Sequence, residues 1–132
     1  MIKVTGTIVA GALFGFGLAL PVPAAADGFE YTWNVRGQMD VNGQIAGVSP
    51  VCAFRQNGSQ ISGNCKGPAA EGPATGVANG DNITFQWTAT ATNSNGRNGI
   101  AVFQGTLGYD GVIRGSYTNS TIPGVTGTFT AQ

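Results

Sequence analysis

The sequence predicts an all-β protein: a single antiparallel up-and-down β-barrel of about eight strands over residues 27–132. Two observations carry this prediction. Apolar and polar residues alternate with period two, which is typical of half-buried strands. Short turns rich in Asn-Gly separate these segments, and nothing after residue 27 has a helical period. A two-sheet β-sandwich is the alternative, but it needs a long crossover that only residues 67–73 come near to supplying.

The number of turn sequences predicts the number of strands. Asn or Asp followed by Gly accepts the positive φ angles of type I′ hairpin turns. Two further breaks, at 67–73 and 119–124, are rich in Gly and Pro. If 95–99 forms one loop, seven turns join eight strands. The Asn-Gly or Asp-Gly pairs are Asn42-Gly43, Asn57-Gly58, Asn79-Gly80, Asn95-Gly96, Asn98-Gly99 and Asp110-Gly111.

The alternation is clearest in three segments, 29–41, 82–92 and 125–131. In the first of these, Phe29, Tyr31, Trp33, Val35, Met39 and Val41 share one face. In the second, Ile83, Phe85, Trp87, Ala89 and Ala91 lie opposite a row of threonines and Gln86. The remaining predicted strands alternate less regularly and cover residues 44–56, 60–66, 73–78, 99–107 and 112–118.

The first 26 residues have the pattern of a secretory signal peptide. Lys3 is followed by the apolar run 8–20 and then by PVPAAA, with small residues at Ala24 and Ala26. This order predicts cleavage before Asp27 and a periplasmic or secreted protein. The apolar run is shorter than the roughly 20 residues of a spanning helix, so no integral membrane segment is expected after cleavage.

The two cysteines are expected to form a structural disulfide. In a hairpin whose tip is Gly58-Ser59, counting outward places Cys52 opposite Cys65, at the separation a disulfide requires. Export places both in an oxidising compartment. A tip at Asn57-Gly58 would shift the register by one and put Cys52 opposite Gly63. Redox and metal roles are disfavoured, because there is no C-x-x-C and two thiolates do not complete a zinc site.

Composition excludes several functions. The chain has no histidine, which rules out Ser-His-Asp and Cys-His catalysis. Glu30 and Asp40 are about ten residues apart on one strand at roughly 3.3 Å each, too far for an acid–base pair. Six basic and six acidic residues give a formal net charge of zero, without the basic footprint of a nucleic-acid-binding protein. We expect no enzyme activity, no cofactor, no metal and no nucleic-acid partner.

The inner face of the predicted barrel is the candidate binding site. An eight-stranded barrel is either just filled by side chains or just wide enough for one small ligand. Inward glycines at Gly37, Gly63, Gly105 and Gly115 are each expected to leave room beside a bulky neighbour. The candidate ligand-binding residues are Tyr31, Trp33, Phe85, Trp87, Phe103 and Tyr117.

Two functions follow from these features, and the oligomeric state is left open. The first is an exported, non-enzymatic barrel that binds a small apolar or amphipathic molecule inside. The alternative is a structural or interaction module with a filled core, whose outer surface, rich in Thr, Asn and Gln, binds a protein or glycan. An outer-membrane barrel is disfavoured, because those polar residues would face lipid.

The chain resembles small exported eight-stranded barrels of the avidin and lipocalin type in architecture. WNVRGQMDVNGQIAG (33–47) is similar in rhythm to the first avidin hairpin, and FQGTLGYDGVIRGSY (103–117) looks like a later one. The resemblance implies a closed barrel over the whole mature length. No functional residue is transferred, because Tyr31 replaces the glycine of the lipocalin G-x-W and no acid follows Asp110.

Mass spectrometry of protein purified from the exported fraction of a bacterial host tests the signal peptide and the disulfide together. We expect a chain beginning at Asp27 and lighter by two hydrogens than its reduced form. A mass that includes residues 1–26, or a mass with two free thiols, contradicts the respective prediction.

Overall fold

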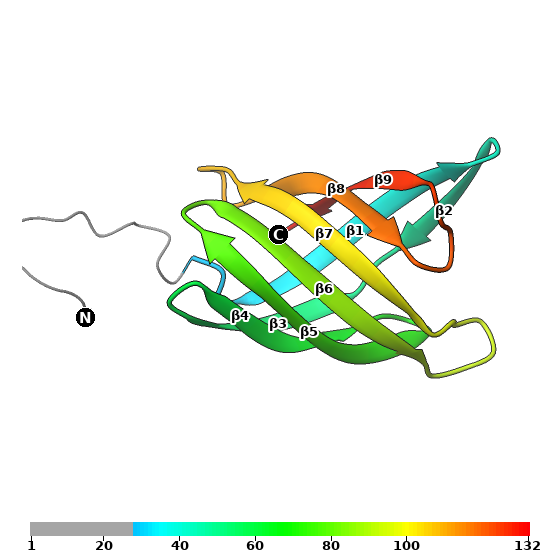
Figure 1. Cartoon of the computed structure of the whole chain (residues 1–132), viewed down its shortest axis with the longest axis horizontal. Helices are drawn as coiled ribbons and strands as arrows, with labels where there is room; N and C mark the ends of the chain where they lie inside the picture. Colours follow the sequence, from blue (N-terminus) through cyan, green and yellow to red (C-terminus); the bar gives the residue numbers. More distant parts are fainter. Residues whose placement is uncertain (1–27) are drawn as a thin grey trace, which may run out of the picture.

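The computed structural model describes residues 28–132 as nine β-strands without a helix (Figure 1). The expected signal peptide 1–26 and its cleavage site before Asp27 lie outside these residues. The described chain contains no helix that could cross a membrane. The strands are β1 (Thr32–Val41), β2 (Gln44–Val48), β3 (Val51–Asn57), β4 (Gln60–Lys66), β5 (Ala70–Asn79), β6 (Asn82–Ala91), β7 (Gly99–Leu107), β8 (Ile113–Asn119) and β9 (Thr126–Ala131).

Eight of these strands close into an antiparallel barrel. From β3 to β9 each strand pairs with the next, and β1 pairs with both β3 and β9. At the closing seam the Asn34 amide donates to the Gln132 carbonyl at 2.7 Å, and the Gln132 amide donates back at 3.1 Å. The predicted all-β up-and-down barrel is confirmed, and the sandwich alternative is excluded.

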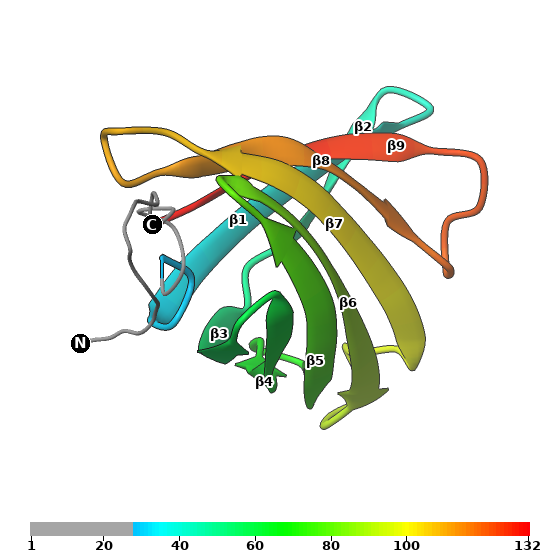
Figure 2. The same cartoon turned by 60° about the vertical axis from the view of Figure 1, so that its left-hand side comes forward.

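The ninth strand, β2, arises from an interruption at Ser49-Pro50. Along β1, the register of β2 continues into β3 without a shift, so the two are halves of one partner strand. Pro50 has no N–H to donate, although its carbonyl still accepts from the Val35 amide at 2.9 Å. The sequence predicted one strand over 44–56, which was wrong at this proline. The β1–β2 hairpin extends past the neighbouring strands (Figure 2).

The hairpin tips use two turn types. Asn42 and Gly43 both have positive φ, 53° and 84°, which confirms the predicted type I′ turn. At the β3–β4 and β5–β6 tips only the glycine is positive, with φ 61° at Gly58 and 60° at Gly80, the pattern of type II′. At β3–β4 this agrees with the predicted Gly58-Ser59 tip, whereas at β5–β6 the expected type I′ turn was wrong, because Asn79 is the last paired residue of β5.

The predicted Gly/Pro break at 67–73 is shorter than expected. Strand β4 ends at Lys66 and β5 begins at Ala70, so only 67–69 form the turn. Pro73 lies within β5 and is solvent-exposed, and the β5–β6 pairing is interrupted at Gly72 and Pro73. Proline has no N–H to donate to β6, and the pairing resumes in the same register at Ala74, so the interruption stays local.

The two cysteines face each other across the β3–β4 hairpin, as predicted. Gly58-Ser59 is the tip, Cys52 lies opposite Cys65, and their Cα atoms are 4.0 Å apart. The disulfide is formed and both residues are fully buried. The bridge therefore joins neighbouring strands on the inner face of the barrel.

Aromatic rings fill the middle of the barrel. Phe85 stacks on Phe103 with ring centroids 4.6 Å apart, and Phe103 stacks on Tyr117 at 5.1 Å. These residues are direct partners across β6, β7 and β8, so the sheet register itself produces the stack. Phe54 and Phe129 pack edge-on against it from β3 and β9. Such rings contribute favourable geometry beyond the area that they bury.

The segment before β1 covers one end of the barrel, which we call the closed end. Phe29 is fully buried, and its amide donates to the Gln56 side-chain oxygen at 3.0 Å. The Gln56 side-chain nitrogen donates to the Gly58 carbonyl at 2.9 Å. The buried side-chain amide of Gln56 therefore links Phe29, which we call the plug, to the β3–β4 turn. The Trp33 indole N–H donates to the Phe29 carbonyl at 3.1 Å.

Replacing both cysteines by alanine should lower the free energy of unfolding by about 3 kcal/mol, because the unfolded chain regains the entropy of an open loop. Equilibrium urea unfolding of the wild type and the double variant checks this. Wild type unfolded in reductant is the matched control and should resemble the variant. Equal midpoints for the oxidised wild type and the variant would show that the bridge contributes nothing.

Candidate functional site

A cavity of about 390 Å³ lies at the end of the barrel opposite the Phe29 plug. We call this the open end, and the connections β1–β2, β4–β5, β6–β7 and β8–β9 surround it (Figure 1). The volume is at the small end of ligand pockets, which run from about 300 to 1,000 Å³. The cavity is lined by Met39, Ala46, Gly47, Val48, Ala70, Trp87, Ala89, Asn95, Arg97, Gly99, Ala101, Tyr117, Asn119, Thr121 and Ile122.

The cavity exists because inward side chains become small toward the open end. Along β6 the inward residues Ile83, Phe85 and Trp87 are followed by Ala89 and Ala91. The inward residues of the neighbouring strand β7 also become small toward this end, since Ala101 lies opposite Trp87 and Gly99 lies opposite Ala89. An eight-stranded barrel is just filled when its inner side chains are large, so alanine and glycine leave space.

The interruption at Pro50 opens the wall beside the cavity. Strand β4 ends at Lys66, opposite Val51, and among the described strands β2 pairs only with β1. Ala46, Gly47 and Val48 of β2 therefore line one side of the cavity, with Ala70 of β5 among the other lining residues. The split of one strand into β2 and β3 shapes the site directly.

Trp87 carries an unsatisfied donor beside the cavity. Its side chain is 5% exposed, and its indole N–H is buried without a hydrogen-bond partner in the described chain. A buried donor without an acceptor costs about 1–3 kcal/mol, and such groups are rare in native proteins. The other tryptophan, Trp33, has its N–H satisfied by the Phe29 carbonyl. The two indoles therefore differ in hydrogen bonding although both are buried.

Tyr117 separates the cavity from the aromatic stack. Its ring passes beside two glycines, and a Cβ at either Gly37 or Gly127 would lie 2.6 Å from the tyrosine Cε1. These glycines form the slot that the ring occupies. Burial raises the pKa of the Tyr117 hydroxyl above its ordinary value, because the phenolate would lose hydration.

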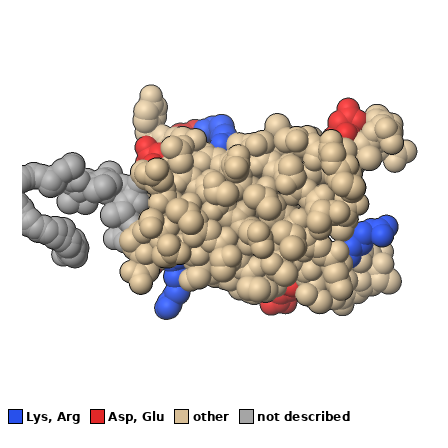
Figure 3. All heavy atoms as spheres, viewed as in Figure 1, with Lys and Arg blue, Asp and Glu red and all other residues tan. Residues whose placement is uncertain are grey.

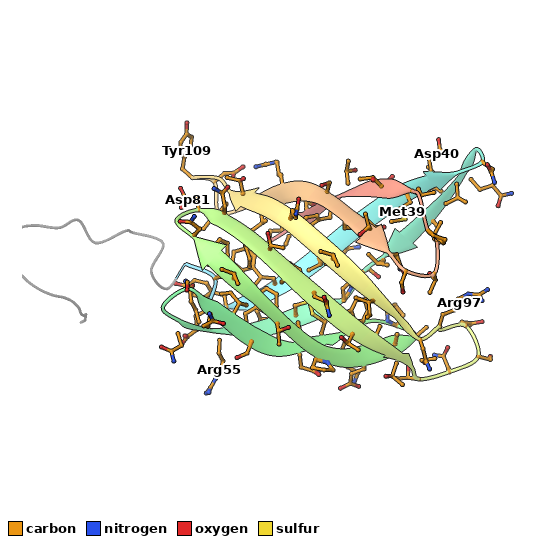
Figure 4. All side chains as sticks on the ribbon, in the orientation of Figure 1. Met39, Asp40, Arg55, Asp81, Arg97 and Tyr109 are labelled. Carbon is orange, nitrogen blue, oxygen red and sulfur yellow. A yellow bond between two sulfur atoms is a disulfide. The ribbon has the colours of Figure 1, made fainter. Side chains whose placement is uncertain are left out.

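Polar groups gather at the mouth of the cavity. Asn119 Oδ1 accepts from the Thr121 amide at 3.0 Å and from its hydroxyl at 2.9 Å. The oxygen is thereby identified, and the Nδ2 amide group of Asn119 donates to no other described residue. Arg97, on the β6–β7 loop at this end, is exposed and forms no ion pair with the described residues (Figure 4).

The charged groups elsewhere are sparse on the face shown in Figure 3. The ion pair found in the described chain joins Arg114 and Asp110 at 2.7 Å, at the β7–β8 turn. The hydrogen bond from Arg114 holds the pKa of the Asp110 carboxyl below its usual value. This pair is exposed and orders the turn, and it lies outside the cavity lining.

The structure brings two of the six predicted ligand-binding residues to the cavity. Trp87 and Tyr117 line it. Phe85 and Phe103 are buried in the aromatic stack, and Trp33 lies at the closed end. The predicted site is therefore divided between a filled core and one open end.

Tyr31 does not face the interior, contrary to the prediction, and its side chain is 64% exposed. Strand β1 begins only at Thr32, and the Tyr31 amide donates to the Phe29 carbonyl at 2.9 Å in a tight bend. The period-two alternation therefore does not extend back to residue 31. Its ring lies at the outer side, 6.2 Å from the Trp33 ring centroid.

The expectation that inward glycines leave empty room was also wrong. The Tyr117 ring fills the space at Gly37, and Ile113 and Phe129 fill the space at Gly105. At Gly63 and Gly115 the backbone of the neighbouring strand takes the space, so these glycines permit close strand approach. The free volume comes instead from Ala and Gly residues near the open end.

Sequence reasoning missed most of the cavity lining. One signal was present, since the change from aromatic residues to alanine along β6 can be read without a structure. The loop residues Arg97 and Thr121 gave no such signal, because loop sequences do not say which way a side chain points, and Asn119 stands at the very end of β8. No cluster of three His, Cys, Asp or Glu residues suited to a metal occurs within 28–132. No protein-family model and no curated protein matches the chain.

The pKa shift of Tyr117 predicts a late step in an alkaline titration. The folded-state pKa is raised, so its contribution to stability is complete below a pH of about 10 and is lost as the pH rises through the folded-state value. Ultraviolet absorbance should show a phenolate component that appears above pH 10 and is absent from Tyr117→Phe. Identical titration curves for the two proteins would contradict this.

Proposed function

We propose that this protein is an exported, non-enzymatic barrel that binds a small apolar or amphipathic molecule at its open end. The observation that carries the proposal is the cavity of about 390 Å³ at the open end, whose wall includes Trp87 and Tyr117. Pockets for small molecules combine apolar and aromatic walls with a few polar groups. Trp87, Tyr117 and Met39 form the apolar and aromatic wall. Arg97 and Asn119 supply the polar groups at the mouth.

Binding accounts for an arrangement that folding alone would disfavour. Filling the end with larger side chains would stabilise a barrel, and an acceptor for the Trp87 N–H would remove a cost of about 1–3 kcal/mol. A ligand that enters the cavity provides the apolar contacts that larger inward side chains would otherwise make. Small inward residues on β6 and β7 keep the space available for it.

Export and the absence of catalysis belong to the same proposal. The Cys52–Cys65 disulfide is consistent with an oxidising compartment, so we place the protein in the periplasm or outside the cell. The lining contains one charged residue, Arg97, and no carboxylate or thiol that could act as a base or nucleophile. A carrier, scavenger or sensor role suits such a pocket better than chemistry does.

The alternative is an interaction module that binds a protein or glycan through its outer face. A shallow polar depression on β6, β7 and β8 supports it, bordered by Thr84, Gln104, Thr106, Arg114 and Ser116. The Thr106 hydroxyl donates to the Asn82 side-chain oxygen at 2.8 Å. Some polar groups of this surface are therefore hydrogen-bonded to each other already. No exposed aromatic residue borders the depression, which makes the cavity the stronger site.

A cavity-filling variant tests the proposed function with the neutral dye N-phenyl-1-naphthylamine as probe. Ala89→Phe should fill the cavity from β6 and weaken binding of the dye about tenfold or more. The adjacent Thr88→Phe is the matched control, because residue 88 points outward, and it should retain binding. Dye fluorescence gives the affinities, and circular dichroism and the urea midpoint confirm that both variants fold.

A second measurement does not depend on Ala89→Phe folding. In Trp33→Phe the remaining tryptophan is Trp87, whose emission should change when the dye binds, whereas the Trp33 emission of Trp87→Phe should change less. Trp33→Phe removes the indole donor to the Phe29 carbonyl, but this carbonyl still accepts from the Tyr31 amide. Absence of dye binding to the wild type, or weaker binding only in Thr88→Phe, would reject the cavity and favour the outer surface.

A further inference from the structure

The charge of the cavity lining is positive only. Of its fifteen lining residues only Arg97 carries a charge, and no acidic residue is among them. The two acids next to lining residues in the sequence form hydrogen bonds outside the lining: Asp40 accepts from the Gly43 amide at 2.8 Å in the β1–β2 turn, and Glu71 accepts from the Asn64 side chain at 3.3 Å. Because Arg97 has no anionic partner in the described chain, its charge is available at the mouth.

The mouth of the cavity carries donors on Arg97 and Asn119, together with the side-chain amide of Asn95, which can both donate and accept. The Asn119 oxygen accepts two hydrogen bonds from Thr121, and the Nδ2 amide group donates to no described residue. Arginine has donors and no acceptor, and the indole of Trp87 can only donate. The cavity lining thus offers the Arg97 guanidinium on the β6–β7 loop and Asn119 Nδ2 on β8 as donors, whereas the Trp87 N–H is buried within the wall.

The sheet register places these donors around an apolar floor. Trp87 lies opposite Ala101, and Ala101 lies opposite Asn119, so the three residues form one layer across β6, β7 and β8. With strands about 4.8 Å apart, the backbones of β6 and β8 are separated by roughly 10 Å at Trp87 and Asn119, with Ala101 between them. An aromatic or aliphatic body fits over Ala101, and its polar group then lies toward Asn119 and Arg97.

We propose that the ligand is a small amphipathic anion, an apolar body carrying one carboxylate, sulfonate or similar oxyanion. The body packs against Trp87, Tyr117 and Ala101, and the oxyanion accepts hydrogen bonds from the Arg97 guanidinium and Asn119 Nδ2. This inference rests on the proposed function and specifies its ligand class. A neutral ligand would leave the Arg97 charge unmatched, and a cationic one would be repelled by it.

Two dyes that differ by one anionic group provide the test. 8-Anilinonaphthalene-1-sulfonate is N-phenyl-1-naphthylamine with an added sulfonate, so the ratio of their affinities isolates the anion. Arg97→Gln should lower the anionic dye's affinity relative to the neutral dye by about fivefold, the range of a partly exposed charge pair. Arg55→Gln, an exposed arginine on β3 near the other end, is the control and should leave the ratio unchanged (Figure 4).

Asn119→Asp tests the role of the Asn119 amide donor. The variant keeps the oxygen that accepts from Thr121 and replaces the donating amide by a negative oxygen, so the turn is preserved while the oxyanion is repelled. The affinity ratio should fall by about tenfold, and added salt should weaken the anionic dye's binding to wild type. The urea midpoint verifies folding.

The outcomes separate the two proposals. An affinity ratio that is the same in wild type, Arg97→Gln and Asn119→Asp overturns the anionic ligand class, and cavity binding of the neutral dye then stands by itself. A ratio that falls equally in Arg55→Gln also overturns it, because the effect would come from overall charge. If neither dye binds in a manner sensitive to Ala89→Phe, the proposed function itself fails.

Discussion

The pairing of β1 with β9 is the constraint on which the other features depend. The reciprocal hydrogen bonds between Asn34 and Gln132 join the first and last strands, so the sheet has no long open edge there. Closure also sets the diameter of the barrel, because eight strands enclose a lumen only as wide as their inward side chains. The sizes of those side chains then decide where the interior is full and where it is empty.

The interior divides into three regions along its axis. At the closed end, Phe29 and the amide of Gln56 cover the lumen through hydrogen bonds between the plug and the β3–β4 turn. In the middle, cross-strand partners stack their rings, and Tyr117 occupies the slot left by two glycines. At the open end, alanine and glycine leave a cavity. Stability is concentrated in the first two regions, and this allows the third to remain unfilled.

The broken strand connects the fold to the candidate site. Pro50 removes one hydrogen bond from the partner strand of β1 and separates β2 from β3, so β2 borders the cavity instead of continuing into the sheet. The disulfide lies just beyond the break and holds β3 to β4. The bridge restrains the hairpin next to the interruption, where the barrel wall lacks a continuous ladder.

Local rules in the sequence were enough for the closed barrel and for the Cys52–Cys65 pair, since alternation and turn type act between neighbouring strands. They also predicted that Trp87 and Tyr117 face inward. The position of the cavity, the outward turn of Tyr31 and the filling of the glycine spaces were decided by the tertiary structure. Each depends on contacts across the lumen, on a bend outside a strand, or on loops such as that of Arg97, where side-chain direction follows from closure and packing and has no period in the sequence.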